Sequence, residues 1–196
     1  MIFELPNTHI SRQLKDMILH QSDLQSAKES IDAMHSYNQK IINTALIQSA
    51  LISYYKCFGD SKFKHYRLEK SKVLSGLPQD AHDSFEFYRN LRRKFVVHDE
   101  SRYADVYVGV VVESTNQTPF VDVVSLAFIA DIATPEYSQV LSSLILATLD
   151  WVTKKIDELN RILINEYKSH SMKEFQTLNE IIYKPPKDDD WLNKRD

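Results

Sequence analysis

Toward the C-terminal end of the chain, apolar residues recur at the spacing of one face of a long helix. The steps between them are 4, 3, 4, 3 and 4 residues, through Ile145, Leu149, Val152, Ile156, Leu159 and Leu163. This is the pattern of a helix that packs lengthwise against other helices. Thr134 and Pro135 predict its N-cap and first position, and an end near Lys168 makes it about 50 Å long. Because a small compact core needs less than that, part of the helix is expected to meet a second subunit.

The rest of the chain has few places where a helix must end. Only three glycines and six prolines occur among 196 residues, which favours long helices over many short strands. We predict helices over about 9–32, 37–58, and from a cap at Asp80 or Asp83 to about His98. Gly59 is expected to form a left-handed cap after the second helix. Its core-facing stripe is expected to be Ile41, Ile42, Ala45, Leu46, Ser49, Ile52 and Tyr55.

The periodicity changes between residues 103 and 130. Alternating valines predict a strand from Tyr103 to Glu113, a second β-rich run follows at 118–130, and the polar segment ESTNQ lies between them. These features predict an antiparallel hairpin inserted at about 104–130. The expected fold class is therefore mainly α, a helical bundle with a long C-terminal helix and an inserted β-hairpin. We predict one helical domain over 1–184 and a flexible tail at 185–196.

Composition excludes several classes of function. A single cysteine, Cys57, excludes an internal disulfide framework, and we interpret it as a helix-core residue. No signal-peptide pattern and no membrane-spanning run is present, so a cytoplasmic protein with no membrane partner is expected. His82-Asp83 and His98-Asp99-Glu100 contain metal-ligand types, but no two of them recur at the helical spacing of a zinc or di-iron site, and no glycine-rich phosphate loop occurs. We therefore expect neither a metal site nor a cofactor.

The distribution of charge says less about whether the chain binds nucleic acid. The net charge of -3 argues against wholesale nonspecific binding of nucleic acid, which depends on many phosphate-neutralising cations. The segment from Lys56 to Lys72 still concentrates six Lys and Arg residues against two acids. It is either a local basic patch or a solvated connector between helices.

The segment LRRKFVVHDE, residues 91–100, carries the most informative chemistry. At about 100° per residue, Arg92 falls within the apolar arc defined by Phe85, Tyr88 and Leu91. Arg93 instead falls on the charged face, where ion pairs in water explain it sufficiently. A guanidinium directed into an apolar surface needs an anionic ligand, a buried carboxylate, or a path along the stripe to solvent.

His98 lies at the predicted end of the same helix, before Asp99 and Glu100. One interpretation is a helix-end imidazole that interacts with the last carbonyl groups. The other is a general acid or base, because the ordinary pKa of histidine lies near neutrality. Arg92 and His98 are too far apart along the helix to touch easily, but they can line one cleft.

This arrangement resembles the signature of the HEPN superfamily, in which an arginine on a helix precedes a histidine by four to six residues. The segment ALISYYKCFGDSK and the long closing helix also resemble the abortive-infection type of HEPN protein, and the resemblance covers about residues 36–168. It implies a helical bundle that dimerises and brings two motifs into one cleft. It further implies a metal-independent endoribonuclease of a prokaryotic defence or toxin system, acting with an antitoxin or defence partner protein.

Carried onto this chain, the resemblance assigns Arg92 and His98 as the catalytic residues. Arg92 would hold the scissile phosphate and His98 would shuttle the proton, while Lys94 and Arg93 are candidates for binding the RNA. Active members commonly have Asn, Asp or His where this chain has Arg93. A second hypothesis therefore stays open, namely a noncatalytic helical dimer module that binds RNA, a nucleotide or a protein partner.

Overall fold

The computed structural model describes residues 2–59, 66–98, 103–113 and 120–182, and it is mainly helical with one small antiparallel sheet. In chain order the elements are α1 (His9–Met34), α2 (Lys40–Lys56), α3 (Lys70–Val73), α4 (Gln79–Leu91), the π-helix η1 (Arg92–Val97), β1 (Ala104–Glu113), β2 (Phe120–Ile129), α5 (Pro135–Tyr167) and α6 (Met172–Phe175). Among the described helices, none is long and apolar enough to cross a membrane.

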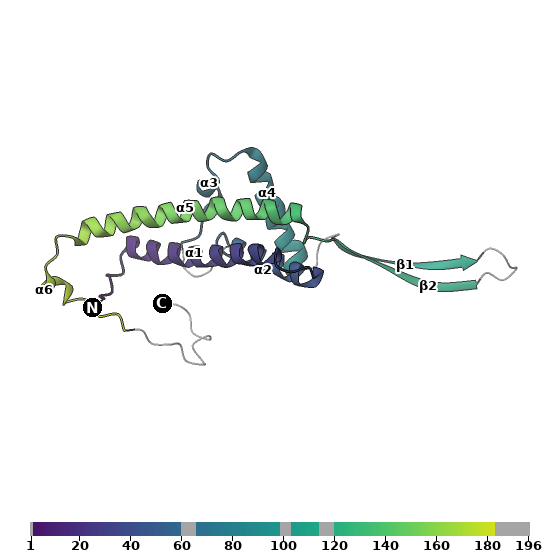
Figure 1. Cartoon of the computed structure of the whole chain (residues 1–196), viewed down its shortest axis with the longest axis horizontal. Coiled ribbons are helices and arrows are strands. Elements are labelled where there is room, and N and C mark those ends of the chain that lie inside the picture. The colour runs from purple at the N-terminus through teal and green to yellow at the C-terminus, as the bar shows by residue number, and fades with distance from the viewer. Residues whose placement is uncertain (1, 60–65, 99–102, 114–119, 183–196) are drawn as a thin grey trace.

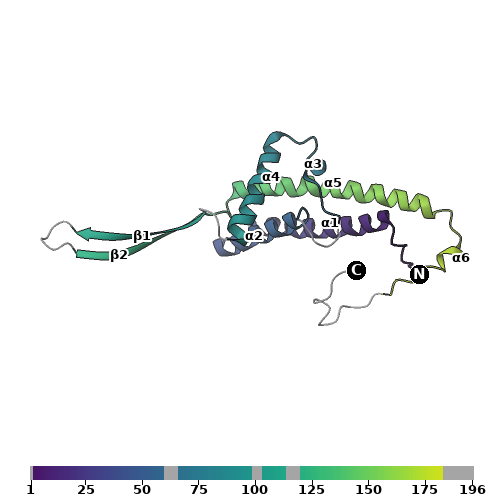
Figure 2. The same cartoon turned by 180° about the vertical axis from the view of Figure 1, so that it is seen from behind.

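Three long helices build the bundle. α1 packs against both α2 and α5, and α1 and α5 run side by side along most of their length (Figure 1 and Figure 2). A capping box starts α1, since the Thr8 side chain accepts from the Ser11 N–H at 3.1 Å and the Ser11 side chain accepts from the Thr8 N–H at 2.9 Å. The apolar face of α1 that enters the core comprises Met17, Leu24, Ala27, Ile31 and Met34.

The seam predicted for the long closing helix is confirmed. α5 begins at Pro135 after its N-cap Thr134, and its C-cap is Lys168. The predicted residues at 145, 152, 156, 159 and 163 are buried, and Leu149 is partly buried against the core. The apolar spacing predicts the buried face of α5 correctly because a helix packed lengthwise must keep one face toward its neighbours over its whole length.

The predicted stripe of α2 is mostly wrong, because Tyr55 is its one buried member. Ile41 and Ile52 are exposed, at 79% and 45%, whereas the buried positions are Ile47, Ala50, Leu51, Tyr54 and Tyr55. The helix also ends at Lys56 with Cys57 as its C-cap, and Gly59 does not adopt a positive φ. Apolar residues surround much of α2, so two different stripes fit the helical period equally well.

The third helix differs from its prediction at both ends. Pro78 is the N-cap of α4 and no side chain caps it, so neither Asp80 nor Asp83 has that role. The α-helix ends at Leu91 rather than near His98, because the backbone changes to a π-helix over Arg92–Val97. A π-helix forms i→i+5 hydrogen bonds, which widens the turn and changes the direction of every side chain that follows.

The hairpin is confirmed, and it projects away from one end of the bundle (Figure 1). β1 and β2 pair antiparallel in the register Ala104↔Ile129 to Glu113↔Phe120. Apolar side chains are exposed on both of its faces, including Val108 at 70% and Leu126 at 56%. Of the turn predicted at 113–117, Glu113 is the last residue of β1 and the other residues lie outside the described ones. Exposed apolar side chains on both faces of a two-stranded arm are unusual, because the largest exposed apolar patches of proteins are often functional.

The two ends of the described chain meet beside α6. Phe3 forms an antiparallel bridge with Glu180, and the Ile181 N–H donates to the Ile2 carbonyl oxygen at 2.8 Å. α6 is a single turn that starts with a capping box at Ser171. The predicted flexible tail at 185–196 lies outside the described residues.

Candidate functional site

Arg92 lies at the junction where α4 becomes η1. Leu91, immediately before it, is buried, and Phe95 and Val96, later in η1, pack against the core. η1 packs on α2, so the segment that carries the motif is supported by the bundle. Single-turn π-helices within α-helices occur frequently at functional sites, because they reorient side chains locally.

The guanidinium of Arg92 has an unusual environment. The side chain is half-buried, and its Nε atom is buried without a hydrogen-bond partner. Within residues 2–59, 66–98, 103–113 and 120–182, no ion pair or hydrogen bond satisfies this side chain. The buried carboxylate considered as the structural explanation for Arg92 is therefore not found in the described part of the chain. A buried N–H donor without an acceptor costs about 1–3 kcal/mol.

The other cations of the motif face solvent. Arg93 and Lys94 are exposed, and Arg93 makes only a long contact of 3.5 Å from its Nη2 atom to the Asn90 side-chain oxygen. The prediction that Arg93 is a surface residue is confirmed. Arg92, Arg93 and Lys94 therefore place three positive charges on the first turn of η1.

His98 ends the π-helix as its C-cap, with φ -128° and ψ 25°, and its side chain is exposed. No hydrogen bond between the Arg92 and His98 side chains is found in the described contacts. The two residues share one short segment without touching. Asp99 and Glu100 lie outside the described residues.

Two tyrosine hydrogen bonds hold α4 in place next to the motif. The Tyr55 hydroxyl donates to the Phe85 carbonyl oxygen at 2.6 Å, and the Tyr88 hydroxyl donates to the Tyr137 carbonyl oxygen at 2.7 Å. Burial raises the pKa of Tyr55 and of Tyr88 above the ordinary value, so both remain neutral donors. These two bonds tie α4 to α2 and α5 and fix the base from which η1 extends.

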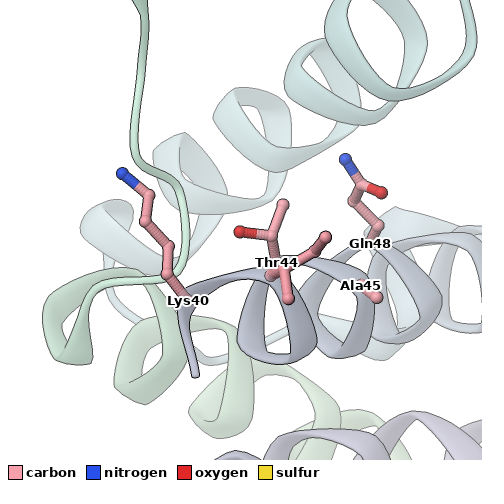
Figure 3. Close-up of a pocket in the computed structure, with 5 residues that line it drawn as sticks. Lys40, Thr44, Ala45 and Gln48 are labelled. Atoms are coloured by element: carbon pink, nitrogen blue, oxygen red, sulfur yellow. The ribbon is translucent and has the colours of Figure 1, made fainter. Parts of the chain in front are cut away.

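A hollow of about 470 Å³ lies over the first half of α2. Lys40, Thr44 and Gln48 project from the same side of this helix (Figure 3), and Ile41 and Ala45 also line the hollow. Lys40 also forms an ion pair at 2.9 Å with Asp131, in the segment between β2 and α5. That contact and a bond from the Ala133 N–H lower the pKa of Asp131. The hollow is lined by α2 alone, so Arg92 and His98 are not part of it.

A second group of candidate ligand side chains was not predicted from the sequence. His20, Asp23 and Cys57 each place one potential ligand atom within 4.8 Å of the others. His20 and Asp23 are three residues apart on α1, a spacing that puts both on one helix face, and Cys57 joins them from the end of α2. The i, i+3 pair was visible in the sequence, but its cysteine partner is 34 residues further along the chain than Asp23.

The thiol of Cys57 is fully buried. Burial, with a smaller contribution from the charge of Asp23, raises the pKa of Cys57 to about 12. It is therefore an uncharged thiol at neutral pH when no metal ion is bound, and it is not an activated nucleophile. The expectation that Cys57 is a core residue agrees with its burial, although the residue also adjoins His20 and Asp23.

Comparisons with protein-family models, with curated protein sequences and with solved structures found no match to this chain.

Proposed function

We propose that the chain is a metal-independent endoribonuclease of the HEPN type, acting as a homodimer in which Arg92 and His98 of both copies share one cleft. The proposal places it in the cytoplasm, in a prokaryotic defence or toxin system with an antitoxin or defence partner protein. It rests on the resemblance of residues 91–100 to the HEPN signature and on the environment of Arg92.

The observation that carries the proposal is the unsatisfied Nε atom of Arg92. A fold tolerates a buried donor without an acceptor when the group has a function that repays the cost. A planar guanidinium binds a phosphate through two parallel hydrogen bonds, and Arg is preferred over Lys wherever this forked geometry matters. Exposed Arg93 and Lys94 add positive charge for the flanking phosphates of an RNA strand.

The chemistry requires a base and an acid at one phosphate. The base removes the proton from the ribose 2'-hydroxyl, and the resulting oxyanion attacks phosphorus. The bond from phosphorus to the 5'-oxygen then breaks, and the acid protonates that oxygen. The products are a 2',3'-cyclic phosphate and a 5'-hydroxyl end. Two copies of His98 can divide these roles, one as the base and one as the acid, while Arg92 stabilises the charge on the phosphate.

A dimer is part of the proposal because one chain supplies a single exposed histidine in the motif. The length of α5 supports it, since 33 residues span about 50 Å. Several apolar side chains of α5 point away from its own bundle, with exposures of 47% at Leu146, 40% at Ile162 and 63% at Ile164. A second copy would cover such residues.

One observation favours the noncatalytic alternative. No hydrogen bond to His98 is found in the described part of the chain, whereas a catalytic histidine is usually oriented by a partner. Together with Arg93 in place of the usual polar residue, this supports a dimer module that binds RNA, a nucleotide or a protein partner without turnover.

The experiment compares cleavage and binding of RNA by the full chain in the presence of EDTA. We expect wild-type protein to produce cyclic-phosphate ends, and Arg92→Ala and His98→Ala each to lower the rate at least hundredfold with an unchanged circular dichroism spectrum. Arg161→Ala and His35→Ala are the matched controls, because both side chains are exposed elsewhere. Full activity in both motif variants would refute the proposal, and binding without cleavage by the wild type would establish the alternative.

A further inference from the structure

We propose that His20, Asp23 and Cys57 form a binding site for a Zn²⁺-class divalent cation that joins α1 to the end of α2. One ligand atom from each residue lies within 4.8 Å of the other two. A thiol, an imidazole and a carboxylate are the donor types that Zn²⁺ takes in proteins. This site uses none of the residues of the proposed ribonuclease motif, so the two proposals stand separately.

The hydrogen bonds of His20 determine which ring nitrogen is available. The Nε2 atom lies 2.6 Å from the Tyr66 carbonyl oxygen, and a carbonyl oxygen can only accept, so Nε2 carries the proton. Four residues earlier on α1, the Asp16 carboxylate accepts from the N–H of the same Tyr66 at 2.8 Å. Both polar groups of the Tyr66 backbone are therefore bound to α1, and the position of the His20 ring is fixed.

The Nδ1 atom of His20 is left buried without a hydrogen-bond partner. In the neutral ring this atom has only a lone pair, which a metal ion would satisfy. Metal-bound histidines commonly donate their second N–H to a carbonyl oxygen, which fixes the tautomer and orients the ring. The bond from His20 to Tyr66 is of this kind, so the ring is prepared to bind through Nδ1.

Cys57 and Asp23 supply the remaining protein ligands. The Cys57 thiol makes only weak contacts, at 3.8 Å to the His20 carbonyl oxygen and 3.7 Å to the Ser53 carbonyl oxygen. Coordination displaces the thiol proton to solvent and leaves a thiolate on the metal. With the Asp23 carboxylate, the thiolate supplies two negative charges against the two positive charges of the ion.

The distances between the three ligand atoms, which are up to 4.8 Å, must shorten only slightly to bind Zn²⁺. Ligand atoms around a tetrahedral Zn²⁺ are about 3.5 Å apart, given bonds of ~2.0–2.3 Å. The side chain of Asp23 is 24% exposed and can move by the required ångström. A water would complete the coordination, as in zinc sites with three protein ligands.

Lys56 opposes the metal ion. Its Nζ atom lies 2.7 Å from Oδ1 of Asp23 and already partly neutralises this carboxylate. Removing the ammonium group should therefore strengthen binding, because a cation beside the site repels a second cation. We expect Lys56→Met to bind Zn²⁺ severalfold more tightly than the wild type.

The test uses the purified full chain, freed of metal with EDTA, dialysed and titrated with Co²⁺. Cys57 is the single cysteine of the chain, so a thiolate-to-cobalt charge-transfer band reports this residue alone. Zn²⁺ should bleach the band at a stoichiometry of one per chain and raise the melting temperature. RNA cleavage is not measured, so this result does not depend on the ribonuclease proposal.

Substitutions identify the ligands. His20→Gln, Asp23→Asn and Cys57→Ser should each weaken Zn²⁺ binding at least tenfold, whereas His35→Gln, an exposed histidine at the end of α1, should bind within twofold of the wild type. Asp23→Asn is the decisive variant, since its partly exposed side chain can change without disturbing the core. Absence of the cobalt band in the wild type would overturn the proposal, as would wild-type affinity in Asp23→Asn or His20→Gln.

Discussion

Replacing Arg92 with methionine tests whether the guanidinium supports the fold or reduces its stability. Methionine keeps an unbranched apolar side chain and removes the charged head, including the buried Nε atom that has no partner. Relief of one unsatisfied buried donor is worth about 1–3 kcal/mol, and the lower end applies because only part of the guanidinium is buried. We expect the free energy of unfolding to rise by about 1 kcal/mol.

The assay is urea unfolding followed by circular dichroism, with thermal unfolding as a second measurement. A gain of about 1 kcal/mol corresponds to a rise of about 2–4 °C in melting temperature for a chain of this size. Protein concentration must be fixed, because dimerisation would make stability depend on it. Arg93→Met is the control and should change stability by less than about 0.5 kcal/mol, since Arg93 is exposed. A loss of more than about 1 kcal/mol in Arg92→Met would refute the reasoning and show that Arg92 is structurally paired.

Three further predictions concern the fold. The Thr148 hydroxyl donates to the Leu144 carbonyl oxygen, so it must accept from the buried Tyr54 hydroxyl. Thr148→Val leaves the Tyr54 hydroxyl without a partner and should lower the free energy of unfolding by about 1–3 kcal/mol. Urea unfolding measures this change, and an unchanged midpoint would contradict the prediction. The contact with Lys40 lowers the pKa of Asp131 below its ordinary value of 3.8, so its contribution to stability is present above that value and is lost as the pH falls through the lowered one. Lys40→Gln should therefore melt below the wild type at pH 7, and the difference should shrink as the pH falls through the lowered pKa of Asp131; a difference that stays unchanged in acid would count against this. Val108→Lys, on the exposed hairpin, should change bundle stability by less than about 0.5 kcal/mol, and a larger loss would show that this face is covered in solution.

The elements predicted correctly are those whose pattern has one solution. The α5 seam runs over five helical steps, and only one face contains all of its members. The hairpin has alternating β-branched residues and polar residues between the two runs, and no helix accommodates that period. The stripe of α2 was predicted wrongly because this helix is apolar on several sides, so its sequence does not show whether Ile47 or Ile41 is buried.

The π-helix at Arg92 and the cluster of His20, Asp23 and Cys57 depend on tertiary contacts that cannot be read from the sequence. Arg92 stood out because a cation occurred among apolar positions, and its half-buried environment agrees with that inference. The π-helix at Arg92 was not predicted, because a widened turn reflects packing of η1 on α2 rather than a residue pattern. The cluster of His20, Asp23 and Cys57 was missed because the bundle, not the spacing along the chain, places Cys57 beside α1.

The hairpin has a thermodynamic consequence for the whole chain. None of the buried core residues in the described part lies between Ala104 and Ile129. Contacts within the arm, such as the edge-to-face pair of Tyr107 and Phe128 at 5.7 Å, stabilise the arm alone. The arm and the bundle are therefore separate cooperative units, and hydrogen exchange in the arm should occur through local opening that leaves the bundle folded. Changes in the length or sequence of the arm can accumulate with little cost to the stability of the helices behind it.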